Sequence, residues 1–233
     1  MKKLMSGAMA VAALALTASP AAAEAGKLQV KVLGTAVLPD GKITKVLVDK
    51  LGPADTAGVP AGTQTEANDN VVPTLAVEYF VTPNISVETI CCLTQHDVDA
   101  SAGPLKGAEL VANAKILPAT VTAKYHMELA PGIKPYIGAG PTYFIFINEK
   151  SGAATKAAFA LPKMHLNDKV GVVAQGGIDI ALGKDSPYSL TLDAKKYWLK
   201  TTATWYDASG AAQLSTRHKL DPWVLSAGVA YRF

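Results

Sequence analysis

The chain has 233 residues, of which 49% are hydrophobic and 18% are charged, and its formal net charge is +3. This small charge is spread along the chain without a basic, aromatic-rich cluster, so the composition gives no support for nucleic-acid binding. The two cysteines, Cys91 and Cys92, are adjacent. Neighbouring residues of a strand point to opposite faces, so these two cannot bridge without severe local distortion, and a count of two excludes a disulfide framework.

The N-terminus has the pattern of a secretory signal peptide. A short basic start precedes an uncharged apolar stretch over residues 4–16, and three alanines at 21–23 offer a small-residue cleavage site. The apolar stretch is short and Pro20 follows it, which disfavours a retained membrane helix. We therefore expect residues 1–23 to be removed during export and residues 24–233 to form the mature domain.

Alternation of apolar and polar residues with a period of two predicts eight β-strands in the mature chain. In the first, Leu28, Val30 and Val32 alternate with Gln29 and Lys31. After the signal peptide no run of about 20 uncharged apolar residues occurs, which excludes a helical membrane span. The predicted strands span residues 27–38, 71–82, 85–96, 110–127, 135–147, 168–182, 188–206 and 221–233.

The connections between these strands alternate between long polar loops and short turns. The long ones cover residues 41–70, 97–107, 148–167 and 207–219, and a segment at 45–49 could form a small hairpin or extend the wall. Outer-membrane barrels show this contrast between long extracellular loops and short periplasmic turns. Closure of the sheet also satisfies every backbone group in lipid. The sequence therefore predicts an all-β fold, an eight-stranded antiparallel transmembrane β-barrel.

The last predicted strand has one apolar face with aromatic residues at both ends. A soluble protein would bury this face in a core, whereas a membrane barrel turns it toward lipid. The chain ends on Phe233. This ending resembles the C-terminal strand of bacterial outer-membrane barrels, where a terminal aromatic residue belongs to the signal read by the barrel assembly machinery. We expect Tyr231 and Phe233 to form this assembly signal.

Four stretches of the mature chain carry a combined pattern: ILPATVTAKYH at 116–126, IKPYIGAGPTY at 133–143, DAKKYW at 193–198 and LDPWVLSAGVAYRF at 220–233. Together they resemble the OmpW family of outer-membrane proteins. The resemblance implies an eight-stranded barrel with a narrow, rather apolar lumen. It also implies passage of small hydrophobic molecules across the outer membrane, with a side opening in the wall as the exit. The long first loop and the adjacent cysteines depart from the family pattern, which leaves the identity of the ligand open.

An eight-stranded barrel encloses space for side chains or for one small ligand. We place Phe80, Ile90, Phe144 and Phe146 on the face that points away from lipid. Trp198 near the outer end could constrict the lumen or belong to the aromatic belt. We expect these five residues to line a narrow apolar channel. The alternative is that they pack the lumen closed.

Pro118 lies inside a predicted strand. A proline there removes one hydrogen-bond donor from the ladder. We interpret Pro118 as a candidate for loosening the wall at a lateral exit, with a tolerated bulge as the alternative. Charged residues on the lumen side predict ion pairs inside the barrel, because buried charges need partners: Glu78, Glu88, Lys124, Asp179, Lys196 and Arg232.

The sequence offers little support for a metal site or an enzyme. His96, Asp97 and Asp99 are metal-ligand residue types, but such residues in a loop at a strand end are usually just solvated. His126 has no obvious serine partner in the sequence, and no G-x-S-x-G motif occurs. We therefore expect no metal, no cofactor and no catalytic residue.

The favoured function is a channel for small hydrophobic molecules in the outer membrane. The alternative is a structural or interaction barrel whose long extracellular loops bind surface partners. Expected partners are outer-membrane lipid, the barrel assembly machinery and small hydrophobic solutes, without nucleic acid.

Overall fold

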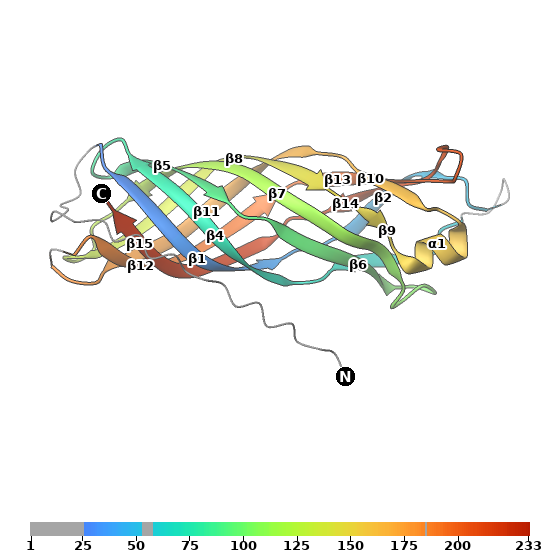
Figure 1. Cartoon of the computed structure of the whole chain (residues 1–233), viewed down its shortest axis with the longest axis horizontal. Helices are drawn as coiled ribbons and strands as arrows, with labels where there is room; N and C mark the ends of the chain where they lie inside the picture. Colours follow the sequence, from blue (N-terminus) through green and yellow to red (C-terminus); the bar gives the residue numbers. More distant parts are fainter. Residues whose placement is uncertain (1–25, 53–57, 185) are drawn as a thin grey trace.

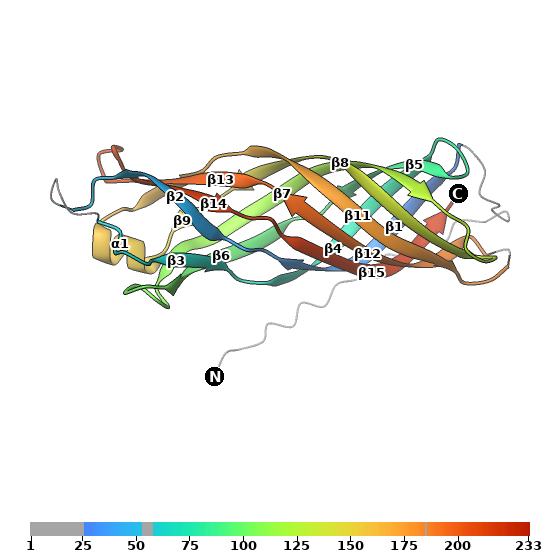
Figure 2. The same cartoon turned by 180° about the vertical axis from the view of Figure 1, so that it is seen from behind.

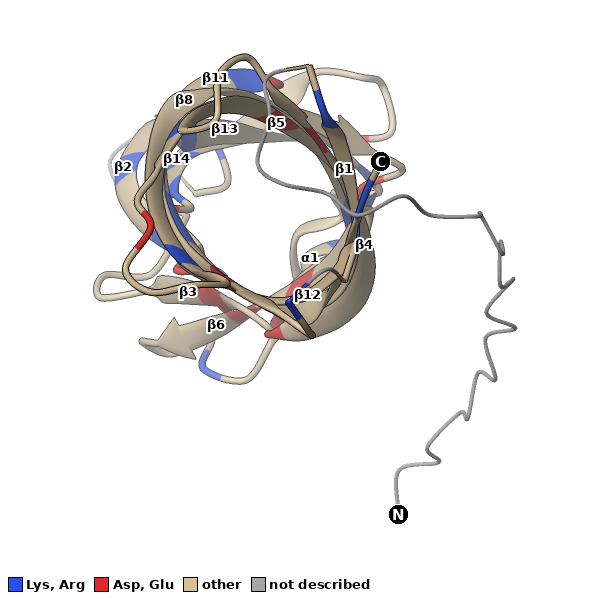
Figure 3. Ribbon diagram, turned by 90° about the vertical axis from the view of Figure 1, so that its left-hand side faces the viewer, with Lys and Arg blue, Asp and Glu red and all other residues tan. Residues whose placement is uncertain are grey.

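The computed structural model describes residues 26–52, 58–184 and 186–233, so the expected signal peptide lies outside the described residues. Within these ranges, eight strands close into one antiparallel barrel (Figures 1 and 3). Each pairs with the next along the chain, and the last pairs with the first. They are β1 (Leu28–Leu38), β4 (Asn70–Phe80), β5 (Ile85–Cys91), β7 (Glu109–His126), β8 (Ile133–Ile147), β11 (Lys169–Ala181), β12 (Tyr188–Trp198) and β15 (Trp223–Arg232). The predicted fold class is confirmed.

Alternation along each barrel strand separates an apolar outer face from a mixed interior. In β1, Gln29 and Lys31 are each 1% exposed, whereas Val32 is 60% exposed. In β11, Val170 and Val172 point outward while Gln175 is buried. An outer surface of valine, leucine and tyrosine side chains is the surface that a barrel presents to acyl chains. In these two strands the predicted lipid and lumen faces are the observed ones.

The two ends of the barrel differ. The short turns lie at the end that carries the C-terminus, hereafter the turn end, and the long connections lie at the opposite end, hereafter the loop end (Figures 1 and 2). At the loop end β3 (Gln64–Ala67), β6 (Thr94–Ala102) and β9 (Lys150–Ser151) extend the barrel sheet, and α1 (Ala153–Phe159) packs beside β7. Within the described ranges, no helix is both long enough and apolar enough to span a membrane.

A second, four-stranded sheet continues the wall at the loop end. It consists of β10 (Lys163–Leu166), β13 (Lys200–Tyr206), β14 (Ala212–Lys219) and β2 (Lys42–Asp49), in that order. The segment at 45–49 therefore extends the wall, one of the two interpretations of its sequence.

The prediction of polar loops at the loop end is wrong in part, because strands occupy much of 41–70, 97–107, 148–167 and 207–219. Beyond the lipid the outward face of a strand meets water, so its residues have the composition of a loop. Two predicted strands are also divided. The strand at 188–206 changes pairing partners at Leu199, and the strand at 85–96 is interrupted at Cys92 and Leu93.

Candidate functional site

The lumen toward the turn end is filled by charged side chains. Glu88 on β5 forms ion pairs with three lysines: its carboxylate lies 2.9 Å from Lys31 Nζ, 3.0 Å from Lys124 Nζ and 3.3 Å from Lys195 Nζ. Glu78 on β4 pairs with two of them, at 2.7 Å from Lys31 and 2.9 Å from Lys124. We name this group the ionic floor: Lys31, Lys124, Lys195, Glu78, Glu88 and Asp193.

Uncharged side chains complete the hydrogen bonding of the ionic floor. Gln175 Nε2 donates to Glu88 at 2.8 Å and to Asp193 at 2.7 Å, and Tyr136 Oη donates to Asp193 at 2.8 Å. Lys124 Nζ lies 3.7 Å from the centre of the Tyr136 ring. Every member is nearly fully buried. Because buried charges are tolerated only when they are paired and hydrogen-bonded, this set is a structural closure of the lumen.

Most of the residues predicted to form interior ion pairs lie in or beside the floor. Glu78, Glu88 and Lys124 belong to it, and Asp179 lies 3.9 Å from Lys31. Arg232 donates to Gln29 at the turn end, and Lys196 donates to the backbone of Asp221, so neither of these two joins the floor. Sequence reasoning missed Lys31, Lys195, Asp193, Gln175 and Tyr136, although the parity of their strands already placed them on the lumen side.

The structure supplies a serine partner for His126, which corrects the sequence-based expectation. Ser86 Oγ and Glu78 Oε1 both lie near His126 Nε2, at 2.9 Å and 2.8 Å. In a catalytic triad of serine, histidine and a carboxylate, the hydroxyl and the carboxylate bind different nitrogens of the histidine ring. Here they share one nitrogen and Nδ1 is unpartnered, so the arrangement is a hydrogen-bonded cluster beneath the floor.

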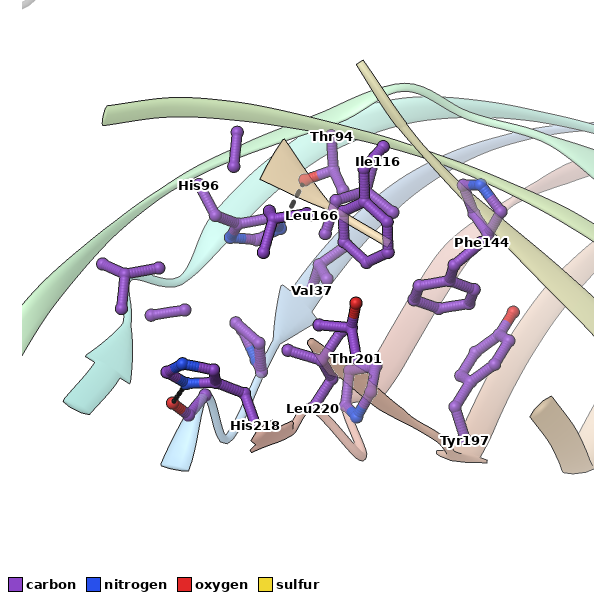
Figure 4. A pocket seen from close by; sticks show the side chains of 18 of the residues that line it. Val37, Thr94, His96, Ile116, Phe144, Leu166, Tyr197, Thr201, His218 and Leu220 are labelled. Carbon is purple, nitrogen blue, oxygen red and sulfur yellow. Dashed lines mark hydrogen bonds between the residues drawn. The ribbon is translucent and has the colours of Figure 1, made fainter. Parts of the chain in front are cut away.

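Directly on the loop side of the floor lies an apolar cavity of about 70 Å³ (Figure 4). Its wall includes Phe144 and Phe146, whose ring centres are 6.5 Å apart, and Tyr197, 5.5 Å from Phe144. Ile90 and Pro118 also line it. The structure thus brings together Ile90, Phe144 and Phe146 of the predicted channel-lining set, with the predicted exit proline beside them.

The other two predicted lining residues lie elsewhere. Phe80 is buried near the turn end, where its ring packs 5.0 Å from His126 and under Arg232, so the floor separates it from the cavity. Trp198 is 46% exposed on the outer surface, because β12 turns Tyr197 inward at this point. The lining role expected for Trp198 is therefore wrong, and its position suits the aromatic belt.

Most of the polar side chains around the cavity are occupied by protein partners, and the Tyr197 hydroxyl is buried without one. His96 contacts the Thr94 hydroxyl at 2.9 Å and the Asn68 carbonyl at 2.6 Å, and Thr201 donates to the Asn167 carbonyl at 2.6 Å. His218 contacts the Thr216 hydroxyl at 2.7 Å and the Gly41 carbonyl at 3.2 Å. These groups offer little to a solute, so the cavity presents an almost purely apolar lining.

Burial lowers the pKa of His218, partly opposed by its hydrogen bond to the Gly41 carbonyl. A folded-state pKa below the ordinary value of about 6.5 means that the unfolded state binds the proton first on acidification, so stability falls as pH drops below that value. We expect the free energy of local opening of β2 and β14 to decrease between pH 7.5 and 5.5. Hydrogen exchange, corrected for the intrinsic rate, measures this directly. In the His218→Asn variant the pH dependence should be largely lost, and an unchanged dependence would contradict the assignment.

A second apolar cavity of about 40 Å³ continues toward the loop end. It is lined by residues such as Ile43, Trp205 and Leu214, and it shares Val98, Val111 and His218 with the first cavity. At the turn end, a polar vestibule of about 400 Å³ lies on the other side of the floor, lined by groups such as His126, Asp179 and Arg232. The lumen therefore has an apolar half and a polar half, separated by the ionic floor.

The wall beside the first cavity has a gap in its backbone ladder. The β5–β7 ladder ends at the pair Ile90–Thr120, and the β6–β7 ladder begins at Thr94–Ile116. Between them, in the same register, Cys92 lies opposite Pro118, which has no N–H to donate, and Leu93 lies opposite Leu117. On the other side, the β4–β5 ladder stops at Leu75–Cys91. We name this interruption, formed by residues 92–93 and 117–119, the wall gap.

The two cysteines and the terminal aromatic residues are placed as their strand parity requires. Cys91 is exposed, Cys92 is buried in the cavity wall, and both thiols are free. Tyr231 packs 4.7 Å from Phe233 at the turn end, and Phe233 N donates to the Leu28 carbonyl at 2.8 Å. In the described part of the chain, no group of three or more His, Cys, Asp or Glu side chains could hold a metal ion, so His96, Asp97 and Asp99 form no such cluster.

A closed antiparallel barrel with an apolar exterior and buried, paired charges inside defines an integral outer-membrane barrel. The chain belongs to the OmpW family, whose model matches residues 24–233, and it resides in the outer membrane. The relatives to which it is similar carry the term outer-membrane protein in their names.

An uncharacterized outer-membrane protein of Sinorhizobium fredii, y4mB, is 35% identical, with 76% of this chain and 71% of the relative covered. Outer membrane protein W of Vibrio cholerae is 30% identical, with 82% and 88% covered. The crystal structure of OprG from Pseudomonas aeruginosa has the same fold, with a TM-score of 0.74 at 24% identity, covering 90% of this chain and 97% of that one.

Proposed function

We propose that this barrel passes small apolar molecules from the cell exterior into the lipid of the outer membrane. The route begins in the cavity at the loop end, continues through the cavity lined by Phe144 and Phe146, and leaves sideways through the wall gap beside Pro118. The observation that carries this proposal is that one apolar cavity lies on the loop side of the closed floor and borders the wall gap at Cys92 and Pro118. The resemblance to the OmpW family, which implies passage of small hydrophobic molecules through a side opening, supports the same proposal.

The ionic floor supports a lateral rather than an axial exit. A solute moving toward the periplasm would have to separate Glu88 from three buried lysines, each within 3.3 Å. Breaking a buried ion pair costs about 3–5 kcal/mol. An apolar molecule makes no interaction that offsets this cost. Through the wall gap the same molecule enters the acyl chains of the membrane without breaking an ion pair.

The lining also favours solutes without hydrogen-bonding groups. A hydroxyl or amide buried without a partner costs about 1–3 kcal/mol, and among the described lining residues the Tyr197 hydroxyl is the free side-chain oxygen that the cavity offers. At about 70 Å³ the cavity is smaller than the ~150 Å³ that accommodates benzene in an engineered protein cavity. Passage therefore requires Phe144 or Phe146 to rotate aside.

A reversible lock across the wall gap tests the exit. In a Cys91→Ser, Cys92→Ser background, Leu93→Cys and Leu117→Cys place two thiols opposite each other across the gap, in the register of the flanking ladders. Oxidation should stop transfer of an apolar fluorescent tracer through proteoliposomes, and reduction should restore it. Bridging is checked by gel mobility under non-reducing conditions.

The matched control places the pair where the ladder is complete. Val87→Cys with Ala123→Cys joins the same neighbouring strands, and both side chains face lipid. Oxidation of this pair should leave tracer transfer unchanged. Equal transfer through the oxidised and the reduced Leu93–Leu117 variant would refute a lateral exit at the wall gap.

Two further assignments complete the proposal. We propose that residues 1–23 are a signal peptide, supported by the start of the family match at residue 24. Tyr231 and Phe233 would serve as the signal for the barrel assembly machinery.

A further inference from the structure

We propose that the outward face of β13, β14 and β2 binds the phosphate groups of the anionic lipid in the outer leaflet. Five cationic side chains lie on this face, hereafter the basic face: Lys42, Lys45, Lys200, Arg217 and Lys219. Figure 3 shows blue segments around the β2 side of the rim.

Strand register brings these cations into direct cross-strand contact. Lys200 pairs with Lys219, and Lys219 pairs with Lys42, so one row across the three strands consists of lysines alone. In the next row Arg217 pairs with Lys45. Like charges directly opposite each other on a sheet are destabilising. Anions beside these rows would relieve the repulsion.

The carboxylates of the chain neutralise this face incompletely. Asp40 lies 3.1 Å from Lys42 and 3.6 Å from Lys219, and Asp221 lies 3.4 Å from Lys219. Within the described residues, Lys45, Lys200 and Arg217 have no carboxylate within 4.0 Å. Three cations of the basic face therefore remain available to an external anion.

The height of the basic face matches the headgroup region. Trp198 and Trp223 are 46% and 49% exposed, and tryptophans at this exposure mark the interface of a membrane barrel. Lys200 follows Trp198 by two residues, which places it about 7 Å farther out at the rise of a strand. Arg217 and Lys45 lie one row, again about 7 Å, beyond.

A lipid fits this surface better than a free anion does. Its phosphates meet the two rows of cations while its acyl chains lie along the exposed apolar surface next to Trp198 and Leu192. The opposite face of the same sheet cannot take part, because His218 and Ala203 on it are buried against the cavity. The occupant is therefore a phosphorylated outer-leaflet glycolipid, held from the lipid side.

The test compares retention of diphosphorylated lipid A by purified protein, measured by native mass spectrometry from detergent. The triple variant Lys45→Gln, Lys200→Gln, Arg217→Gln should bind at least about tenfold more weakly, since it loses three cations that attract the lipid phosphates. The dephosphorylated lipid should bind the wild type and the variant equally. Heat-modified gel mobility reports whether the variant is folded.

The matched control removes three exposed lysines at the same end of the molecule but off this sheet: Lys106→Gln, Lys150→Gln, Lys156→Gln. It should retain lipid A as the wild type does. Equal retention by both triple variants would overturn the proposal. So would displacement of lipid A by inorganic phosphate at equal concentration, because that result would assign the face to a free anion.

Discussion

The Ala203→Phe substitution is expected to reduce transfer of apolar tracers about tenfold or more. Ala203 is 1% exposed on β13, and its side chain lines the first apolar cavity. A phenyl ring there fills a space of about 70 Å³ that a solute must cross. Displacing an overpacked side chain costs about 1–3 kcal/mol, which corresponds to this loss. The measurement is the initial rate of tracer transfer in proteoliposomes.

The control for this variant adds the same ring outside the barrel. Ala227 lies on the lipid face of β15, so Ala227→Phe should leave the rate unchanged. Heat-modified gel mobility confirms that both variants fold. A rate for Ala203→Phe equal to that of the Ala227→Phe control would show that solutes do not cross this cavity.

Glu88→Gln is expected to lower the free energy of unfolding by about 3–5 kcal/mol. Glu88 is 2% exposed and meets three lysine ammonium groups within 3.3 Å. The amide keeps the shape but removes the charge, which leaves three buried cations with too few anions. Equilibrium unfolding in urea from lipid vesicles provides the measurement.

The matched control is Glu128→Gln, an exposed carboxylate at the turn end. Surface carboxylates contribute little, so its unfolding midpoint should stay close to that of the wild type. If Glu88→Gln unfolded at the same urea concentration as Glu128→Gln, the ionic floor would not contribute to the stability of the barrel.

Period-two alternation was enough to predict the barrel and the orientation of most of its side chains, with Trp198 as an exception. Phe144, Phe146 and Ile90 were placed in the lumen because each lies on the parity opposite to the lipid-facing residues, and the structure places them there. The same rule placed Glu78 and Glu88 inside. Lipid makes this signal strong, since an outward polar residue at membrane depth is costly.

The height of a residue along the barrel could not be read from alternation. Phe80 faces the lumen as expected but lies below the floor, and only strand tilt and register determine that. The pairing of Ser86 with His126 likewise depends on the β5–β7 register. At the loop end water lies outside the barrel, so the outward residues of a strand are polar and the alternation of apolar and polar residues weakens. The sequence of a strand such as β14 therefore has the composition of a loop.

The ionic floor also constrains how the polypeptide can enter a bilayer. Lys31 lies on the first strand and can reach Glu88 across its neighbour β4, but Lys195 lies on the seventh strand and meets Glu88 only once β1 has paired with β15. A partly inserted, unclosed sheet would leave lumen charges such as Lys195 without their cross-lumen partners beside hydrocarbon, at about 2–4 kcal/mol for each cation. The free energy of such an intermediate is higher than that of the closed barrel by the sum of several of these penalties. Membrane insertion and ring closure should therefore occur as one cooperative event.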